Sequence, residues 1–527
     1  MSAQSITEEK APVDNSRYKW EVLGVVMIGT LMAALDTSIV NVSIPAIMAD
    51  FGASLDSIEW VVTGYMLAFA TLMPLTSWLS NRIGHKNLYV WSLAVFTVGS
   101  LLCGLAWNTP TLVAARVIQA IGGGAIMPTS MAIISDVFEP HERGRAMGYW
   151  GVGVIIGPAF GPTVGGYLTA AFGWPSIFFI NLPIGVLGVW ATLRILRPDK
   201  PGVEHHKPFD YWGFAFLSLF LIAFLYGVSR GEHDGWTSPL IIWCGILSVV
   251  GVTGFLLVES HVEHGIMDLS LFRYPVFSVS MLLTATRSIA LFGGVFLLPV
   301  YLQQIKGLDE IESGLILLPG SLIIAFFMPI AGYMSEKVGT RYLALFGMAG
   351  LWLFMYMYRD LTAETSNWDI ILPTLVRGVA MAFLMAPLMA TMMNSVPRNK
   401  SGMASSMMNL MQQIAGALGI AVLAMVLANR THFHMGVIGS SMNPESPVFQ
   451  ESVRNVAERA HALGYDQVTA GMVAQATVVK AGVTRASEMA FQDSFMVGAL
   501  IVLLTILPVF LLPGKPSAKP SKPVVME

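Results

Sequence analysis

Long apolar runs, separated by short polar connections, dominate the pattern of hydrophobic and polar positions along this chain. A helix needs about 20 mostly apolar residues to cross the hydrocarbon core of a bilayer. Fourteen runs of this kind occur, each bounded by charged residues or a turn. The predicted spans are residues 20–44, 57–79, 87–106, 110–134, 145–170, 174–195, 211–229, 238–258, 275–302, 313–334, 341–358, 370–393, 402–428 and 491–512. The pattern therefore predicts an all-α polytopic membrane protein.

One connection is much longer than the others. Residues 431–490 contain no spanning run, and Glu451, Arg454, Glu458 and Arg459 recur at helical spacing within them. This spacing predicts one or two amphipathic helices outside the bilayer. Two interpretations of the segment stay open. It is either a docking surface for a periplasmic adaptor protein, if the host has an outer membrane, or a passive cover.

The Lys and Arg residues are unevenly distributed, and this predicts the orientation. The polar ends, residues 1–19 and 513–527, lie on the same side of the membrane if the number of spans is even. Nearly all Lys and Arg residues of the short connections fall on that side too. By the positive-inside rule, both termini are predicted to be cytoplasmic. The first apolar run is too long for the core of a cleavable signal peptide.

The composition supports a membrane protein and excludes several other classes. Hydrophobic residues make up 54% of the chain and charged residues only 12%, against about 25% charged in soluble domains. The net charge of −3 argues against a nucleic-acid partner. The two cysteines lie in apolar runs, so a disulfide framework is not expected. No phosphate-binding loop of the G-x-x-x-x-G-K-[ST] type occurs, so ATP is not expected to drive the protein directly.

Two short stretches, residues 77–86 and 332–341, resemble each other at an offset of 255 residues. Each ends a predicted span and opens a tight turn with basic residues. The candidate gate-loop residues in them are Asn81, Arg82, Gly84, Lys86, Glu336 and Lys337. Anchoring of basic residues at the cytoplasmic face explains the charges, but it does not explain the shared glycine and spacing. We therefore interpret the stretches as parts of an internal repeat of six spans, which is typical of secondary transporters.

The repeat predicts how the chain is divided. Spans 1–6 and 9–14 would form two six-helix bundles, with two inserted spans between them. The predicted boundaries are 1–19 for a cytoplasmic tail, 20–195 for the N-terminal bundle, 196–274 for a linker with two extra transmembrane helices, 275–512 for the C-terminal bundle with its outer segment 431–490, and 513–527 for a second cytoplasmic tail.

Three further motifs resemble the major facilitator superfamily, and they are most similar to its fourteen-span EmrB/QacA-type branch of drug:proton antiporters. Residues 35–45 resemble the first-span signature of that branch, and residues 115–122 resemble the fourth-span motif linked to proton coupling. Residues 157–166 resemble the fifth-span antiporter motif. Its characteristic residues here are Gly157, Pro158, Gly161, Pro162, Gly165 and Gly166.

This resemblance implies a fold of two six-helix bundles plus two inserted helices, and a function in transport rather than catalysis, with no cofactor. It implies a bacterial plasma (inner) membrane protein that exports amphipathic or cationic drugs by alternating access, driven by inward proton flow. Export of a dedicated endogenous metabolite or lipid on the same scaffold is the alternative. A channel or membrane-embedded enzyme is disfavoured because the sequence contains no charged ring, filter loop or catalytic constellation.

The loop after the second span departs from the family pattern. Members of the family usually have a glycine there, then an aspartate four residues later and an arginine after it. Here these positions hold Ser77, Asn81 and Arg82. An asparagine can accept a hydrogen bond but attracts a cation less strongly than a carboxylate does. In the second copy of the loop, Glu336 retains the acid.

Asp36 is the only one of the 33 acidic residues that lies deep within a predicted span. Placing a charge there costs at least about 2.5–3.5 kcal/mol on insertion scales. Arg116 lies at a similar depth in the fourth span. Burial favours the neutral form of a carboxyl group and a nearby arginine favours the charged form. We therefore expect Asp36 and Arg116 to couple transport to proton movement, the alternative being a permanent structural ion pair.

Arg287 and Arg377 also lie within predicted spans, and the sequence offers them no obvious acidic partner. They are either satisfied by backbone carbonyls, water, Gln412 or Gln413, or they contact anionic groups of a substrate. No histidine lies in a predicted span, so a histidine proton relay is not expected. His432 and His434 are too weak a pair to predict a metal site.

Methionines are concentrated in the twelfth and thirteenth predicted spans, where Met385 and Met411 are candidates for the lining of a substrate cavity. Flexible thioether side chains adapt to ligands of varied shape. The clusters favour a site for diverse apolar ligands over a narrow sugar pocket, with ordinary packing as the alternative.

Overall fold

A computed structural model describes residues 15–198, 208–262, 265–397, 400–441 and 446–514, which contain helices and no β-strand. The N-terminal helices are α1 (Asn15–Phe51), α2 (Leu55–Leu72), α3 (Leu75–Ile83), α4 (His85–Gly104), α5 (Thr109–Val137), α6 (Arg143–Phe172), α7 (Ser176–Phe179) and α8 (Asn181–Ile195). The next elements are α9 (Tyr211–Asp234), α10 (Pro239–His261) and the short 3₁₀ helix η1 (Leu269–Arg273). The C-terminal elements are α11 (Pro275–Gln304), α12 (Glu310–Val338), α13 (Thr340–Met357), η2 (Tyr358–Asp360), α14 (Asn367–Asn394), α15 (Ser401–Ser441), α16 (Pro447–Ala462), α17 (Gln467–Leu504) and η4 (Leu507–Leu511).

Every predicted span coincides with a helix or with a pair of helices. Twelve helices of the described chain are long and apolar enough to cross a membrane, and α2 with α3 forms a further, bent candidate. The 55° bend between them falls at Met73 and Pro74, where proline removes a backbone donor. Helix α13, which begins with Thr340 and Arg341, occupies another predicted span but lies outside this set. The count of fourteen spans therefore stays a prediction.

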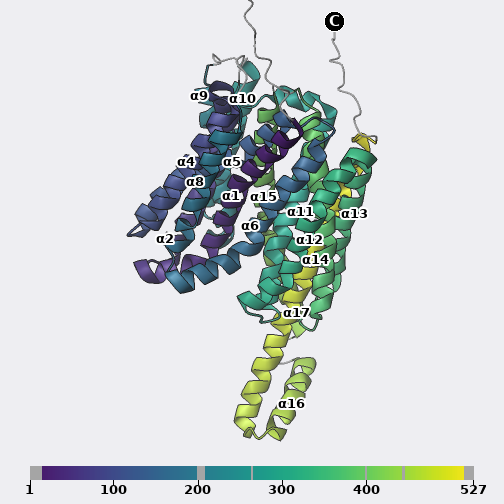
Figure 1. The fold of residues 1–527 in the computed structure, drawn as a ribbon. Helices are drawn as coiled ribbons and strands as arrows, with labels where there is room; N and C mark the ends of the chain where they lie inside the picture. Colours follow the sequence, from purple (N-terminus) through teal and green to yellow (C-terminus); the bar gives the residue numbers. More distant parts are fainter. Residues whose placement is uncertain (1–14, 199–207, 263–264, 398–399, 442–445, 515–527) are drawn as a thin grey trace, which may run out of the picture.

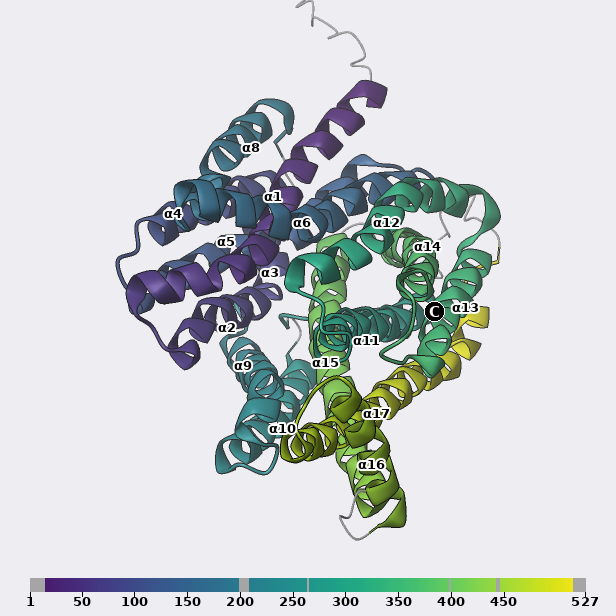
Figure 2. The same cartoon turned by 90° about the horizontal axis from the view of Figure 1, so that it is seen from below.

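The helices form two bundles with an inserted pair beside them, as Figure 1 and Figure 2 show. Helices α1, α2, α4, α5, α6 and α8 pack together, and so do α11 to α15 with α17. The two bundles contact each other mainly through α6 against α12 and α14, and through α5 against α15. Helices α9 and α10 pack on each other, and α9 also lies against α2 of one bundle and α15 of the other.

Both ends of the described chain lie at the same end of the molecule, which we call the termini end. Lys19 near the start of α1 pairs with Glu142 at 2.5 Å, just before α6. Arg341 at the start of α13 donates from its backbone N to the carbonyl of Pro513 at 3.2 Å. Figure 1 shows α16 at the opposite end, which we call the α16 end. The predicted tails 1–19 and 513–527 fall largely outside the described residues, and their cytoplasmic location stays a prediction.

The predicted outer segment, residues 431–490, differs in form from a separate loop. Helix α15 continues into it as far as Ser441, and α17 already begins at Gln467. Helix α16 lies between them in sequence and packs on α17, and Figure 1 shows it beyond the bundles. No proline interrupts residues 467–504, so the helix runs unbroken from the segment into the last predicted span.

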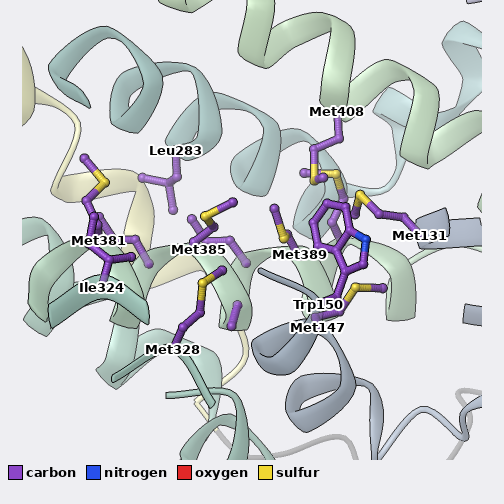
Figure 3. Packing of buried hydrophobic residues seen from close by; sticks show 14 of the residues in the cluster. Met131, Met147, Trp150, Leu283, Ile324, Met328, Met381, Met385, Met389 and Met408 are labelled. Atoms are coloured by element: carbon purple, nitrogen blue, oxygen red, sulfur yellow. The ribbon is translucent and has the colours of Figure 1, made fainter. Parts of the chain in front are cut away.

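Methionine side chains fill much of the interior of the C-terminal bundle. Met381, Met385 and Met389 of α14 are buried together with Met328 of α12 and Leu283 of α11, as Figure 3 shows. Unbranched thioethers fill irregular gaps between helices well. In this conformation Met385 therefore takes part in packing.

Candidate functional site

The carboxylate of Asp36 lies in a fully buried polar network inside the N-terminal bundle. Arg116 of α5 donates from Nη1 to Asp36 Oδ2 at 2.6 Å. Gln119, one turn further along α5, donates from Nε2 to Asp36 Oδ1 at 2.8 Å. Asn181, the first residue of α8, donates to the same oxygen at 3.0 Å. The structure thus brings together the two residues that the sequence predicted and adds two amide donors.

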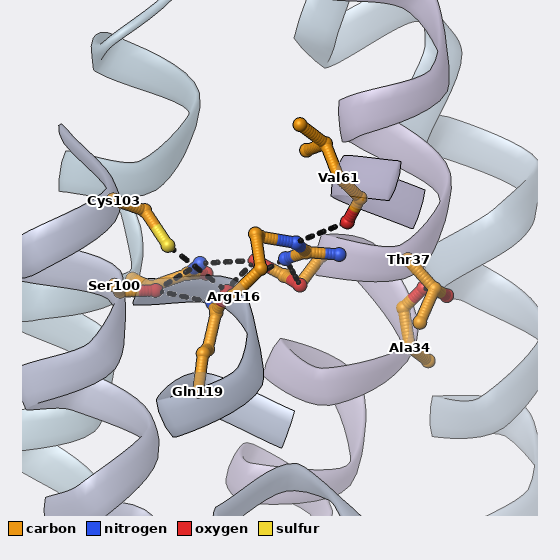
Figure 4. Close-up of polar contacts among 9 residues, drawn as sticks. Ala34, Thr37, Val61, Ser100, Cys103, Arg116 and Gln119 are labelled. Atoms are coloured by element: carbon orange, nitrogen blue, oxygen red, sulfur yellow. Dashed lines mark hydrogen bonds and ion pairs between the residues drawn. The ribbon is translucent and has the colours of Figure 1, made fainter. Parts of the chain in front are cut away.

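The amide donors are themselves held in place by Ser100 of α4. The Ser100 hydroxyl oxygen accepts from Gln119 Nε2 at 2.6 Å and from Asn181 Nδ2 at 3.0 Å (Figure 4). Four helices, α1, α4, α5 and α8, therefore supply side chains to one network. Because these bonds satisfy both carboxylate oxygens, the network compensates for placing Asp36 away from water.

Arg116 has further partners on α2. Its Nε donates to the backbone carbonyl of Val61 at 3.3 Å, and its guanidinium lies 3.9 Å from the ring centroid of Tyr65. Its Nη1 also donates to Gln119 Oε1 at 2.6 Å. The Tyr65 hydroxyl is buried and has no hydrogen-bond partner within the described part of the chain. The ion pair is thus connected to the backbone of α2 as well as to α1.

Sequence reasoning missed the polar residues around the ion pair. Gln119 could have been found, because it follows Arg116 by three residues and so shares its helical face. Asn181 and Ser100 lie on helices whose spacing to Asp36 is set only by tertiary packing. For these two, the only signal was a polar side chain within an apolar run.

The glycines of the antiporter motif bring α6 against α1 beside Asp36. A Cβ added at Gly157 would lie 2.6 Å from the backbone carbon of Ala34, and one at Gly161 would lie 2.7 Å from Ser38 Cβ. Gly165 contacts Ile39 in the same way, at 2.6 Å. These three positions therefore require glycine for helix packing. Gly166 is different, because an added Cβ would meet its nearest neighbour at 3.9 Å.

The two prolines of the motif, Pro158 and Pro162, lie inside the unbroken helix α6. The carbonyl of Pro158 accepts from the Ser38 hydroxyl at 3.5 Å. The motif therefore packs within the N-terminal bundle, whereas earlier glycines of α6 face the other bundle. A Cβ added at Gly144 would lie 2.6 Å from the carbonyl of Gly332 on α12.

The other candidates for substrate contact lie in the C-terminal bundle. Arg287 of α11 is buried and donates from Nη2 to Gln412 Oε1 at 3.0 Å, while its Nη1 has no hydrogen-bond partner among the described residues. Arg377 of α14 is buried, with its guanidinium 5.5 Å from the ring centroid of Phe354. Arg287 thus contacts one of the two glutamines raised as partners, whereas Arg377 lies against an aromatic ring.

The remaining candidates occupy different surroundings. Gln413 lines a cavity between α2, α9, α11 and α15, whereas Met385 is packed in the interior. Met411 is partly buried against the same interior cluster. The residues predicted to line one substrate cavity therefore do not lie together in this conformation.

The two gate loops share a backbone turn but differ in their contacts. Gly84 and Gly339 both have a positive φ, of 85° and 89°, which favours glycine at both positions. In the second loop, Glu336 Oε1 accepts from the backbone N of Arg145 on α6 at 3.0 Å, which joins the two bundles. Asn81, at the equivalent place in the first loop, is exposed.

The basic residues of the gate loops contact their own bundles. Lys86 donates from Nζ to the carbonyl of Leu193 at 3.1 Å. The guanidinium of Arg82 lies 5.2 Å from the ring centroid of Trp78, and the Lys337 ammonium lies 4.5 Å from that of Tyr333. These contacts fix the loops on the helix ends that carry them.

Further polar contacts join the two bundles near the termini end. Arg143 donates from Nη1 to the carbonyl of Met393 at 3.1 Å and to Asn394 Oδ1 at 2.9 Å. Asn394 in turn donates to the carbonyl of Pro140 at 2.9 Å. Ser405 of α15 donates to the carbonyl of Pro128 in α5 at 2.8 Å. Together with Glu336, these bonds hold the bundles closed at this end.

Comparison with known proteins identifies relatives over most of the chain. It is 33% identical over 503 residues to an uncharacterized MFS-type transporter, YhcA, of Bacillus subtilis, covering 94% of this chain and 93% of that protein. It is 30% identical over 485 residues to the multidrug export protein EmrB of Escherichia coli K12, covering 90% and 92%. It is 31% identical over 406 residues to the riboflavin transporter RibZ of Clostridioides difficile, covering 77% and 87%.

The fold is also similar to that of solved transporters. The structure of the human organic anion transporter MFSD10 (TETRAN) matches with a TM-score of 0.58 at 15% identity, covering 92% of this chain and 99% of that one. Residues 26–420 match the sequence profile of the Major Facilitator Superfamily. The chain is thus a multi-pass membrane transporter and not an enzyme, and it belongs to the major facilitator superfamily.

Proposed function

We propose that this protein is a proton-coupled multidrug efflux transporter, a drug:H⁺ antiporter that exports amphipathic or cationic compounds by alternating access. The observation that carries the proposal is the network around Asp36, the one acidic side chain deep in a predicted span. Its partner Arg116 and the two amide donors belong to two other helices, α5 and α8. A carboxylate held in this way is expensive to bury, and such residues within membrane spans commonly mark proton pathways.

The geometry suggests how a proton would be linked to movement. Asp36 is fully buried, so a proton reaches it only when the surrounding helices separate. Protonation removes the negative charge that attracts Arg116 and converts one carboxylate oxygen from an acceptor into a donor. Arg116 is then free to change its contact with the Val61 carbonyl of α2. Proton binding would therefore alter how α1, α2 and α5 pack.

The location and partners follow from the same proposal. We place the protein in the bacterial plasma (inner) membrane with both termini in the cytoplasm, so the termini end is the cytoplasmic end. Protons would enter from the α16 side and compounds would leave on it. In a host with an outer membrane, α16 and the adjoining part of α17 would meet a periplasmic adaptor. Arg287 and Arg377 would then serve substrates that carry an anionic group.

Export of one dedicated endogenous metabolite is the second candidate. It is favoured by the similarity to RibZ, whose name describes a transporter of riboflavin. The two candidates share the scaffold and differ in the breadth of substrates.

Expression in a bacterial host that lacks its own drug pumps tests the proposal. Drug susceptibility and efflux of a fluorescent cation such as ethidium are measured together, with and without a pH gradient across the membrane. We expect increased resistance to several unrelated compounds and efflux that stops when the gradient is collapsed. Efflux that persists without a proton gradient contradicts proton coupling, and transport of a single metabolite without drug resistance supports the second candidate.

A further inference from the structure

A cavity of about 330 Å³ lies between the two bundles and the inserted helix pair. Its walls come from α2 of the N-terminal bundle, from α9, and from α11 and α15 of the C-terminal bundle. Figure 2 shows α9 beside both α2 and α15. The volume is at the lower end of the range for sites that bind small molecules.

The lining of this cavity is mostly apolar. Phe292 and Phe296 of α11 line it together with Ala417 and Ile420 of α15. Gln413 contributes the largest uncharged polar side chain of the lining. Such a surface suits a ligand with a large apolar body and few hydrogen-bonding groups.

The cavity lies toward the α16 end of the helices, next to a group of charged side chains. Arg230 of α9 forms ion pairs with Glu59 and Asp56 of α2 and with Asp234 at the end of α9, the last two at 3.8 Å and 3.4 Å. Glu59 precedes the lining residue Thr63 by one helical turn, so the two share a face of α2. The charged group lies on the same helices as the lining, one turn beyond it on α2, and we call it the rim of the cavity.

Among the side chains that the structure describes, negative charge exceeds positive charge at this rim. Three carboxylates surround one guanidinium, and the side chains of Asp56 and Glu59 are 68% and 36% exposed. Two cations of the C-terminal bundle, Lys306 after α11 and Arg430 in α15, have partners of their own. Lys306 donates to the carbonyl of Thr365 at 2.6 Å, and Arg430 pairs with Asp493 at 2.6 Å. The rim thus complements a cation better than a neutral molecule or an anion.

We propose that this cavity binds an amphipathic organic cation, with the apolar body of the ligand between α2, α9, α11 and α15 and its positive charge facing the carboxylates of Asp56 and Glu59. The inference rests on the proposed function and deepens it, because it assigns the inserted pair a part in the binding of cationic substrates. Helix α9 supplies one wall and, through Arg230 and Asp234, part of the rim.

Binding of two probes of matched shape and opposite charge tests the proposal. The probes are tetraphenylphosphonium and tetraphenylborate, measured by equilibrium dialysis on the full-length protein in lipid nanodiscs without a gradient. After subtraction of binding to empty nanodiscs, we expect the cation to bind and the anion to bind at least several-fold more weakly. Equal binding of both probes overturns the proposal and identifies the cavity as a site for any apolar group, such as a lipid acyl chain.

A substitution that fills the cavity tests the location. Ala417→Phe should weaken tetraphenylphosphonium binding on the order of tenfold. Ala215→Phe is the matched control, since Ala215 lies exposed on α9 and outside the lining. If Ala417→Phe does not fold, Ala417→Cys replaces it, and tetraphenylphosphonium should slow its modification by a maleimide. Cys103 and Cys244 are buried. Unchanged binding to Ala417→Phe, or unprotected labelling of Ala417→Cys, overturns the proposal.

Removal of one negative charge from the rim tests whether the carboxylates attract the cation. Glu59→Gln should weaken binding of the cation about fivefold and leave binding of the anion equal or stronger. Glu21→Gln on α1, which also removes one paired carboxylate but near the termini end, should change neither. An unchanged affinity of Glu59→Gln for the cation contradicts the assignment of the rim.

The same variants separate this inference from the proposed function. If the wild-type protein exports no cation at all, the proposed function fails. If it exports tetraphenylphosphonium and Ala417→Phe exports it equally well, then the cavity is not the site and only this inference fails.

Discussion

Glu336 accepts a hydrogen bond from the backbone N–H of Arg145, a residue 191 positions earlier in the chain and in the other bundle. The N–H belongs to the first turn of α6, which begins at Arg143. Backbone N–H groups at a helix start lack intrahelical partners and carry partial positive charge. A carboxylate at that place therefore binds the first turn of α6 and stabilises the conformation that is closed at the termini end.

Replacing Glu336 by alanine should favour conformations that are open at the termini end. The loss of one charge-assisted hydrogen bond corresponds to about 1.5–3 kcal/mol. The measurement is the distance between spin labels on exposed positions of α3 and α12, which should shift toward longer values. Glu21→Ala serves as the control, and an unchanged distance distribution contradicts the role assigned to Glu336.

Asp36→Asn should leave the protein inserted in the membrane, because it removes a buried charge instead of adding one. It should abolish efflux that depends on the pH gradient while still allowing tetraphenylphosphonium to bind. Asp36→Glu should retain part of the activity with a shifted pH profile. Uptake into inverted vesicles at several pH values checks this, because export from the cell becomes uptake in that orientation. If Asp36→Asn still transports at the normal rate with a pH gradient, Asp36 does not carry the proton. Another carboxylate, such as Glu59 or Asp493, would then do so.

Arg116→Ala should also stop coupled transport, for the opposite electrostatic reason. Without the guanidinium the carboxyl of Asp36 loses its compensating cation, so its protonated form is favoured. Transport should therefore stall because the proton is not released. Exchange of substrate for substrate needs no net proton release, so it should be less impaired than efflux driven by a pH gradient. Equal loss of both activities would indicate that Arg116 has a structural role only.

Gly157→Ala should destabilise the protein by about 1–3 kcal/mol, because the added Cβ would lie 2.6 Å from the backbone of α1 at Ala34. Backbone atoms cannot move aside as a flexible side chain can. Gly166→Ala belongs to the same motif and meets its nearest neighbour only at 3.9 Å, so it should be nearly neutral. Thermal unfolding of both variants in detergent tests the difference. Equal melting temperatures would contradict the close packing of α6 on α1.

The ion pair between Asp268, in the linker after α10, and Lys400 should contribute to stability in a way that depends on pH. Asp268 pairs with Lys400 at 2.5 Å, just before α15. Burial alone would raise the pKa of Asp268, but hydrogen bonds from Lys400 and Ser270 and the charge of Lys400 lower it below its usual value. Because the pKa of the folded state is the lower one, the contribution is complete above about pH 4 and is lost as the pH falls through the folded-state value.

Asp268→Asn should therefore lower the free energy of unfolding by about 1 kcal/mol at neutral pH. The difference from the wild-type protein should shrink as the solution is acidified below about pH 4. Melting curves recorded across this pH range check the effect. A difference that stays constant with pH would show that the ion pair contributes nothing.

The sequence predicted the spanning helices and the central ion pair because both depend on local signals. Each apolar run can be recognised from its own residues, and Asp36 and Arg116 stand out as charges among apolar neighbours. The amides of Gln119 and Asn181 carry no charge, and their place beside Asp36 depends on how four helices pack. The extension of α15 and α17 into residues 431–490 was also missed, since polar residues can continue a helix that hydropathy appears to end.

Helix α2 presents opposite faces to the two sites described above. Val61 and Tyr65 contact Arg116, while Thr63, Met66 and Leu67 line the cavity beside α9. The two faces of a helix move together, so a molecule in the cavity that moves α2 also changes the surroundings of the ion pair. By thermodynamic linkage the influence is mutual. A proton on Asp36 would then change the affinity of the cavity for its ligand by some factor. The bound ligand would change the affinity of Asp36 for the proton by the same factor.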